Sequence, residues 1–149
     1  MMTEPITYVL SYGMSKIVLT LTDDRFVSRA PMQNVDIPLS ALRNFCLAPV
    51  VHNMVDQYDS QLIVSWNENG KVNSKKIYVR QGDVSFQQFL AALQQKRPDA
   101  SLLHLPPAEA QKQMGVLSTN KMAWIVGLGI VALIIIVVLV LWLTGTFQS

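Results

Sequence analysis

The stretch from Met122 to Leu143 constrains this chain most, because MAWIVGLGIVALIIIVVLVLWL contains no charged residue and no proline. At about 1.5 Å per residue it predicts a helix of roughly 33 Å, enough to cross a hydrocarbon core of about 30 Å. The run at 133–141 is apolar on every face, unlike a surface helix of a soluble protein. Trp124 and Trp142 lie near the two ends, where indole rings prefer the headgroup level. We therefore predict one transmembrane helix over residues 122–143.

The flanks of this helix predict its orientation. Lys112 and Lys121 precede it, whereas the short tail at 144–149 is neutral, so the N-terminal side is expected to be cytoplasmic. The first ten residues, MMTEPITYVL, have neither a basic start nor the long apolar core of a secretory signal. We expect a tail-anchored, single-pass protein whose N-terminal domain lies in the cytoplasm.

The charge and cysteine content exclude several classes of function. Residues 1–97 hold ten Lys or Arg against eight Asp or Glu, and this near-neutral balance argues against a nucleic-acid partner. Cys46 is the single cysteine, so no internal disulfide can form. It is interpreted as a buried residue of a strand, and with only His52 and His104 beside it no zinc spacing exists.

Candidate catalytic groups are few. Both histidines are interpreted as ordinary surface or partly packed residues, and Asp23, Asp24 and the pair Asp56, Asp59 as turn carboxylates. No glycine-rich phosphate loop is present. We therefore expect no enzyme activity, no catalytic site, no metal and no cofactor, although neighbouring residues in space could still build an active site.

Seven short segments rich in β-branched and aromatic residues, bounded by turn formers, predict strands. Residues 50–60 show no clear period and are interpreted as a loop. Asn69-Gly70 predicts the turn of a hairpin within a polar tip at 67–74. The predicted strands are Ile6–Tyr12, Lys16–Leu21, Arg25–Arg29, Asn34–Pro38, Arg43–Ala48, Gln61–Trp66 and Lys75–Arg80.

A helix is predicted after Gly82. Ser85 and Gln88 match a capping box, and Val84 and Phe89 match a hydrophobic staple around it. Pro98 ends the helix at about Arg97. Its apolar face is expected to cover an opening in the strands. That face consists of Phe86, Phe89, Leu90 and Leu93.

Residues 98–121 are predicted to be a linker, because they contain Pro106-Pro107 and no sustained period. Leu102, Leu103 and Leu105 either fold back onto the domain or lie in the membrane interface. A short helix at 108–114 is also possible. The predicted organisation is a domain at 1–97, the linker at 98–121, the transmembrane helix at 122–143 and a tail at 144–149.

The order, sizes and spacing of VDIPLSALRNFCLAP, QLIVSW, KKIYVR and VSFQQFLAALQQKRP resemble a bacterial pleckstrin-homology-like (PH-like) domain over residues 5–97. The resemblance rests on pattern and on no invariant motif. It implies a mainly β fold: a seven-stranded half-open barrel of two nearly orthogonal antiparallel sheets, capped by a C-terminal amphipathic α-helix. A lipocalin-like or other small β-barrel capped by a helix is the alternative.

Four lysines are candidate contacts to anionic lipid headgroups. In phosphoinositide-binding pleckstrin-homology domains the loop between the first two strands carries several basic residues, whereas here it offers only Lys16. Lys71, Lys75 and Lys76 cluster on the predicted hairpin and could press onto an anionic bilayer. The alternative is a solvated hairpin whose lysines protect an edge strand.

The anchor also offers a candidate packing surface. Ala123 and Gly127 are four residues apart and Gly129 lies near them, which favours close approach of another transmembrane helix, although glycine can also simply be tolerated there. Two functions follow as hypotheses. The first is a non-catalytic interaction module at the bacterial inner membrane, an accessory or assembly subunit of a larger membrane protein complex. The second is a sensor of anionic lipid or headgroups.

Overall fold

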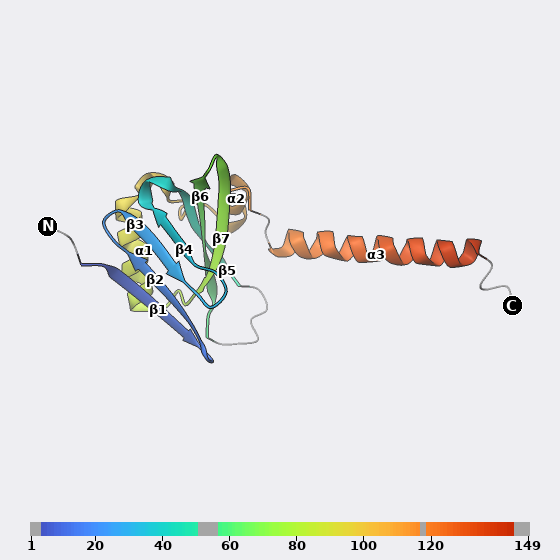
Figure 1. Cartoon of the computed structure of the whole chain (residues 1–149), viewed down its shortest axis with the longest axis horizontal. Coiled ribbons are helices and arrows are strands. Elements are labelled where there is room, and N and C mark those ends of the chain that lie inside the picture. Colours follow the sequence, from blue (N-terminus) through green and yellow to red (C-terminus); the bar gives the residue numbers. More distant parts are fainter. Residues whose placement is uncertain (1–3, 51–56, 117–118, 145–149) are drawn as a thin grey trace. The chain divides into compact units, whose positions relative to one another are not determined.

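A computed structural model describes residues 4–50, 57–116 and 119–144, with side chains of the last range from Trp124 on. The chain divides into two compact units, a head at Met1–Met114 and an anchor unit at Gly115–Ser149. Each unit is considered by itself. The described head is mainly β, as expected, with two antiparallel sheets and two short-to-medium α-helices (Figure 1).

The two sheets of the head follow the chain in order. One holds β1–β2–β3–β4 and the other β5–β6–β7, with every neighbouring pair antiparallel, and they are not closed into a barrel. A 3₁₀ turn at Leu39–Ala41 joins them at a corner. All seven predicted strands are confirmed. The bounds are β1 Ile6–Tyr12, β2 Ser15–Leu21, β3 Arg25–Arg29, β4 Val35–Pro38, β5 Leu42–Pro49, β6 Ser60–Glu68 and β7 Lys71–Val79.

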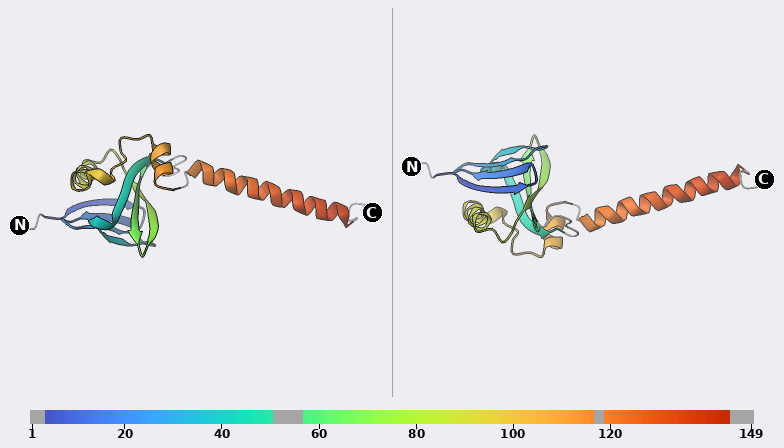
Figure 2. Two further views of the ribbon diagram at one scale, coloured as in Figure 1. Left: turned by 90° about the horizontal axis from the view of Figure 1, so that it is seen from above. Right: turned by 90° about the horizontal axis from the view of Figure 1, so that it is seen from below.

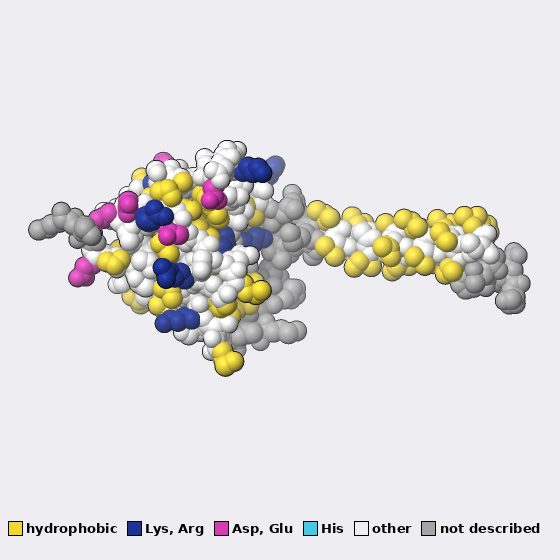
Figure 3. Space-filling model, viewed as in Figure 1, with side chains coloured by type: hydrophobic (Ala, Val, Ile, Leu, Met, Phe, Trp, Pro, Cys, Tyr) yellow, Lys and Arg dark blue, Asp and Glu magenta, His cyan; other side chains and the backbone are white. Residues whose placement is uncertain are grey.

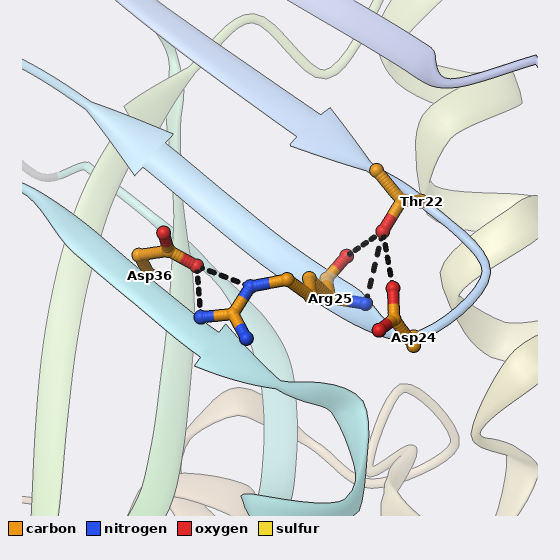
Figure 4. Close-up of polar contacts among 4 residues, drawn as sticks. All are labelled: Thr22, Asp24, Arg25 and Asp36. Atoms are coloured by element: carbon orange, nitrogen blue, oxygen red, sulfur yellow. Dashed lines mark hydrogen bonds and ion pairs between the residues drawn. The ribbon is translucent and has the colours of Figure 1, made fainter.

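The turn between β2 and β3 is fixed by side chains that the sequence places there. The Thr22 hydroxyl accepts a hydrogen bond from the Arg25 backbone N–H at 3.0 Å and lies 3.0 Å from the Asp24 carboxylate (Figure 4). The Arg25 guanidinium then reaches across to Asp36 on β4, with Nε 2.8 Å from Oδ1. Asp24 is thus a turn carboxylate, as predicted.

The β6–β7 hairpin is longer than expected. Asn69 has φ 51° and Gly70 φ 75°, the left-handed conformations that a two-residue hairpin turn needs. The turn prediction is therefore confirmed. The predicted polar tip at 67–74 is wrong, since pairing continues up to Glu68 and Lys71. The polar residues next to the hairpin turn belong to the strands, because their backbone groups pair while their side chains face water.

The main core lies inside the two sheets and is covered by α1 (Val84–Lys96) (Figures 1 and 2). The predicted apolar face of this helix is buried as expected. Phe86 packs on Tyr8 of β1 with ring centroids 5.1 Å apart, and Phe89 on Phe26 of β3 at 6.1 Å. Lys96 at the end of the helix forms an ion pair with Asp23, 2.8 Å away.

The predicted start of α1 is wrong. The N-cap is Asp83, so Ser85 lies within the first turn and the capping box with Gln88 does not form. Val84 is 72% exposed, which excludes the staple with Phe89. Instead the Gln87 side-chain amide donates to the Gln81 carbonyl at 2.6 Å and holds the chain before the helix. The way the chain leaves β7 in the folded head therefore decides where α1 begins.

Residues 98–114, here called the strap, belong to the head. They contain a 3₁₀ turn at Pro98–Ala100 and α2 (Pro107–Gln113), so the predicted linker is wrong over this range and the predicted domain end at Arg97 comes too early. The Leu102 N–H donates to the Phe45 carbonyl at 2.9 Å, and Ser101 forms a parallel bridge with Phe45. Of the two alternatives for Leu102, docking on the domain is confirmed.

The strap buries the outer face of the second sheet. Phe45 points into the main core, so its neighbour Cys46 points the opposite way, towards the side that α2 covers. Both views of Figure 2 show α2 next to β5. The buried residues here lie outside the main core and form what we call the outer cluster: Cys46, Ala48, Ile63, Leu102, Ala110 and Met114.

The anchor unit contains α3 (Thr119–Leu143). Among the described residues, α3 is the one helix that is long and apolar enough to cross a membrane, and this stretch covers Trp124–Leu143. Its described side chains face outward on all sides and are hydrophobic in Figure 3. The length and composition predicted for a transmembrane helix are therefore confirmed.

Candidate functional site

Among the described residues, the groups that the sequence offered as candidates for chemistry do not come together. Cys46 is 1% exposed, and burial raises the pKa of its thiol to about 11, so it is an unreactive buried residue as predicted. His104 lies exposed on the strap, and His52 and Asp56 lie outside the described residues. The Asp59 carboxylate accepts from the Gln81 backbone N–H at 2.9 Å, a structural bond. Across residues 4–50, 57–116 and 119–144 no group of acidic, His or Cys residues is placed to hold a metal.

The four candidate lipid-contacting lysines are spread over the head. Lys75 pairs with the inward-facing Val64, whereas Lys76 pairs with Ile63 of the outer cluster, so the two side chains leave opposite faces of β7. Lys71 lies at the hairpin turn and Lys16 on β2, in the other sheet. On the face in Figure 3 basic side chains are likewise dispersed.

A groove on the head is the strongest candidate site. Its hollow of about 250 Å³ lies between β7, the turn from β1 to β2 and the loop that follows β3. Most of its wall is apolar or aromatic. We call it the tyrosine groove, and it is lined by Tyr12, Ser15, Ile17, Ala30, Pro31, Met32, Gln33, Lys75, Lys76, Ile77 and Tyr78.

Aromatic rings organise one side of the tyrosine groove. Tyr58 stacks on Tyr78 with centroids 4.3 Å apart and meets the edge of Tyr12 at 6.1 Å, so rings from β1, β7 and the segment before β6 form a row. Tyr78 remains 37% exposed and Met32 is 94% exposed. Apolar surface is thus offered to solvent on both sides of the hollow.

The charged lining of the tyrosine groove is basic. Among the described residues that line it, the charged ones are Lys75 and Lys76, and none carries a carboxylate. The Lys75 ammonium donates to the Gln33 carbonyl, which joins β7 to the β3–β4 loop. Partial burial lowers the pKa of Lys75. Within the described part of the chain no carboxylate lies at ion-pair distance from this ammonium.

The small residues of the anchor are only partly brought together. Gly127 lies in a shallow hollow of α3 with Trp124, Leu128 and Val131. A helix turns about 100° per residue, so Gly129 lies roughly 200° around from Gly127, on another face. The Ala123 side chain lies outside the described part of the structure.

Sequence reasoning offered docking of Leu102 and a short helix at 108–114, and α2 confirms that helix, but it missed that residues 98–114 belong to the head, and it missed the tyrosine groove. The sequence does carry a signal that residues 98–114 belong to the head. This segment contains Leu102, Ala110 and Met114 and is too apolar for a free linker. The groove had none, since Tyr12, Met32 and Tyr78 are far apart in sequence and only the packing of two sheets brings them together.

Comparison with known proteins does not place the chain in a family. No family model matches, and no curated protein matches. Among solved structures, the hSac2 domain from human phosphoinositide phosphatase Sac2 aligns with a TM-score of 0.42 and 8% identity, covering 68% of this chain and 72% of that one.

Proposed function

We propose that this protein is a membrane-tethered, non-catalytic interaction module, an accessory or assembly subunit of a larger protein complex in the bacterial inner membrane. The proposal rests on one observation: an apolar helix exposed along Trp124–Leu143 follows a separately folded head. Such a helix needs a bilayer or another membrane protein around it.

The head is proposed to be a PH-like domain in the cytoplasm. The succession of four strands, three strands and a helix over the core supports this fold. Tethering confines the head to two dimensions and raises the effective concentration of a partner in the same membrane. The tyrosine groove supplies a surface on which such a partner can bind, because exposed apolar residues flank a ready hollow.

The test is purification of the full-length chain from its native membrane in a mild detergent, with a tag at the N-terminus. We expect a stoichiometric membrane protein to co-purify. A variant ending at Met114 serves as the control for recruitment through the membrane, and recovery of the partner is expected to fall strongly with it. Release of the intact chain by a carbonate wash, or no partner from native membranes, would contradict the proposal.

A further inference from the structure

The strap is bonded to the rest of the head at its beginning. The Arg97 guanidinium, directly before the strap, donates to the Leu39 carbonyl and forms an ion pair with Asp99, 2.8 Å away. Further on, the Leu102 N–H donates to the Phe45 carbonyl at 2.9 Å. These contacts join the first part of the strap to the corner between the two sheets and to β5.

The end of the strap, α2, is held mainly by packing. It lies against β5, with Ala110 and Met114 buried (Figure 2). Its backbone hydrogen bonds run within the helix, from Ala110 back to Pro106 and from Met114 back to Ala110. Within the described part of the chain, no hydrogen bond or ion pair joins α2 to the sheets. A helix of seven residues is marginal by itself, so its packing on β5 maintains it.

Buried polar atoms weaken this packing. The Gln111 side chain of α2 is 8% exposed, and its Oε1 has no hydrogen-bond partner within the described residues. The buried Ser101 hydroxyl of the strap has none among them either. A polar atom buried in this way costs free energy in the docked state, whereas water supplies a partner when the strap leaves the sheet. Gln111 therefore favours release at the end of the strap that polar bonds do not hold.

Release of α2 lengthens the chain between the head and α3. With α2 in place, residues 115–118 separate Met114 from Thr119, where α3 begins. Fully extended, that stretch spans at most roughly 18 Å. When α2 leaves β5 and unfolds, the free stretch begins after Leu105, and the same spacing per residue gives roughly 50 Å. The state of α2 therefore decides how long the tether is.

We propose that α2 is a releasable part of the strap that sets the length of the tether between the head and the membrane. Packed on β5, it limits the tether to residues 115–118, and once released it extends the tether to residues 106–118. This proposal rests on the membrane anchoring in the proposed function and adds a means of regulation. A partner that binds the head only at the longer reach selects the released state, because a ligand shifts an equilibrium towards the state that it binds.

The test uses the full chain in phosphatidylcholine nanodiscs and measures the alkylation rate of Cys46. This thiol lies in the outer cluster that α2 helps to bury, so a reagent reaches it when α2 leaves. Gln111→Met keeps the length of the side chain and removes the buried oxygen. The variant should slow alkylation by about tenfold, because the docked state no longer carries the cost of that oxygen.

Gln113→Met is the matched control, since it makes the same exchange at an exposed position of the same helix. It should leave the alkylation rate within about twofold, as surface substitutions do. An equal rate for Gln111→Met and Gln113→Met would overturn the proposal, because the buried oxygen would then have no effect on release.

A second measurement reports the length of the tether. A donor dye at the N-terminus and acceptor dyes on lipid headgroups give the energy-transfer efficiency of single molecules. Ala110→Glu buries a charge under α2 and should release it, so the root-mean-square span of the tether rises from about 12 Å to about 21 Å. The mean efficiency should fall, whereas the exposed Ala108→Glu should leave it unchanged. Faster alkylation of Cys46 in Ala110→Glu at unchanged efficiency would overturn the proposal.

This proposal and the proposed function fail in different ways. If no partner co-purifies with the unmodified chain while Gln111→Met and Ala110→Glu behave as expected, the interaction module is refuted and the variable tether stands. If a partner co-purifies while Gln111→Met alkylates as fast as the unmodified chain, the tether proposal alone is refuted.

Discussion

The phenol oxygen of Tyr8 on β1 lies 2.9 Å from the backbone nitrogen of Arg80, the residue after β7, and accepts its hydrogen bond. Tyr8 belongs to the first sheet and Arg80 directly follows the last strand of the second sheet, so one buried side chain joins the first strand to the end of the last. The hydroxyl also lies 3.5 Å from the Asp83 carboxylate at the N-cap of α1. Burial is the largest cause of the raised pKa of Tyr8.

Tyr8→Phe is therefore expected to destabilise the head by about 1 kcal/mol, because the Arg80 N–H loses its acceptor while the ring remains packed. Urea unfolding of residues 1–114, followed by circular dichroism, measures this difference. Tyr12→Phe is the control, since this hydroxyl on the same strand makes no hydrogen bond within the described residues. Equal stability of the two variants would show that the Tyr8 hydroxyl does not join the sheets.

Because the Cys46 thiol is buried, we expect the head to lose stability in alkali. Its pKa in the folded head is raised from 9.0 to about 11 by burial, so the folded state keeps a proton that the unfolded state loses. The stability from this neutral thiol is complete below pH 9 and falls as pH rises through about 11, by on the order of 2 to 3 kcal/mol. Cys46→Ala should show a shallower fall in the free energy of unfolding over this window. Parallel pH curves would contradict the assignment.

The strap is predicted to shield Cys46 from reagents. Ala110 is fully buried in the outer cluster, so Ala110→Glu places a charge there and should loosen the strap. A loss of about 1.4 kcal/mol in local stability would raise the alkylation rate of Cys46 about tenfold. Ala108→Glu on the exposed side of α2 is the control and should leave the rate near that of the unmodified chain. Because Cys46 is the single cysteine, one labelled peptide in mass spectrometry reports the result.

A charge in the middle of α3 should weaken membrane insertion. Ile134 lies near the centre of the apolar helix, where arginine costs roughly 2.5 to 3.5 kcal/mol. Ile134→Arg is expected to lower the fraction of chain that resists carbonate extraction. Thr144→Arg, one residue after the helix, should not, because a terminal arginine reaches the headgroups. Full retention of Ile134→Arg would mean that another protein, and not lipid, surrounds this position.

Much of the fold was predictable where local pattern and burial agree. The alternation in segments such as Lys16–Leu21 and the helical spacing from Phe86 to Leu93 each marked the face that is buried. The capping box at Ser85 failed because Gln81 and Asp83, positioned by the end of β7, set the start of α1. Local signals mark an element, but neighbouring elements decide its ends.

The candidate site was predictable only in its residue types. The lysines at 71–76 were visible in the sequence, but the register of β6 with β7 sends Lys75 and Lys76 to opposite faces. A shift of one residue would exchange those faces. The tyrosine groove likewise depends on the position of β7 against the β3–β4 loop. The hydrogen bond from Lys75 to the Gln33 carbonyl joins these two segments.

The sequence by itself determined the apolar helix at the C-terminal end, the seven strands and the buried face of α1, because each follows from the period of neighbouring side chains along the chain. Only the tertiary structure decided that the strap covers Cys46, that Tyr8 joins the two sheets and that a groove opens beside β7. These depend on contacts between residues far apart in sequence, and no local period encodes such contacts.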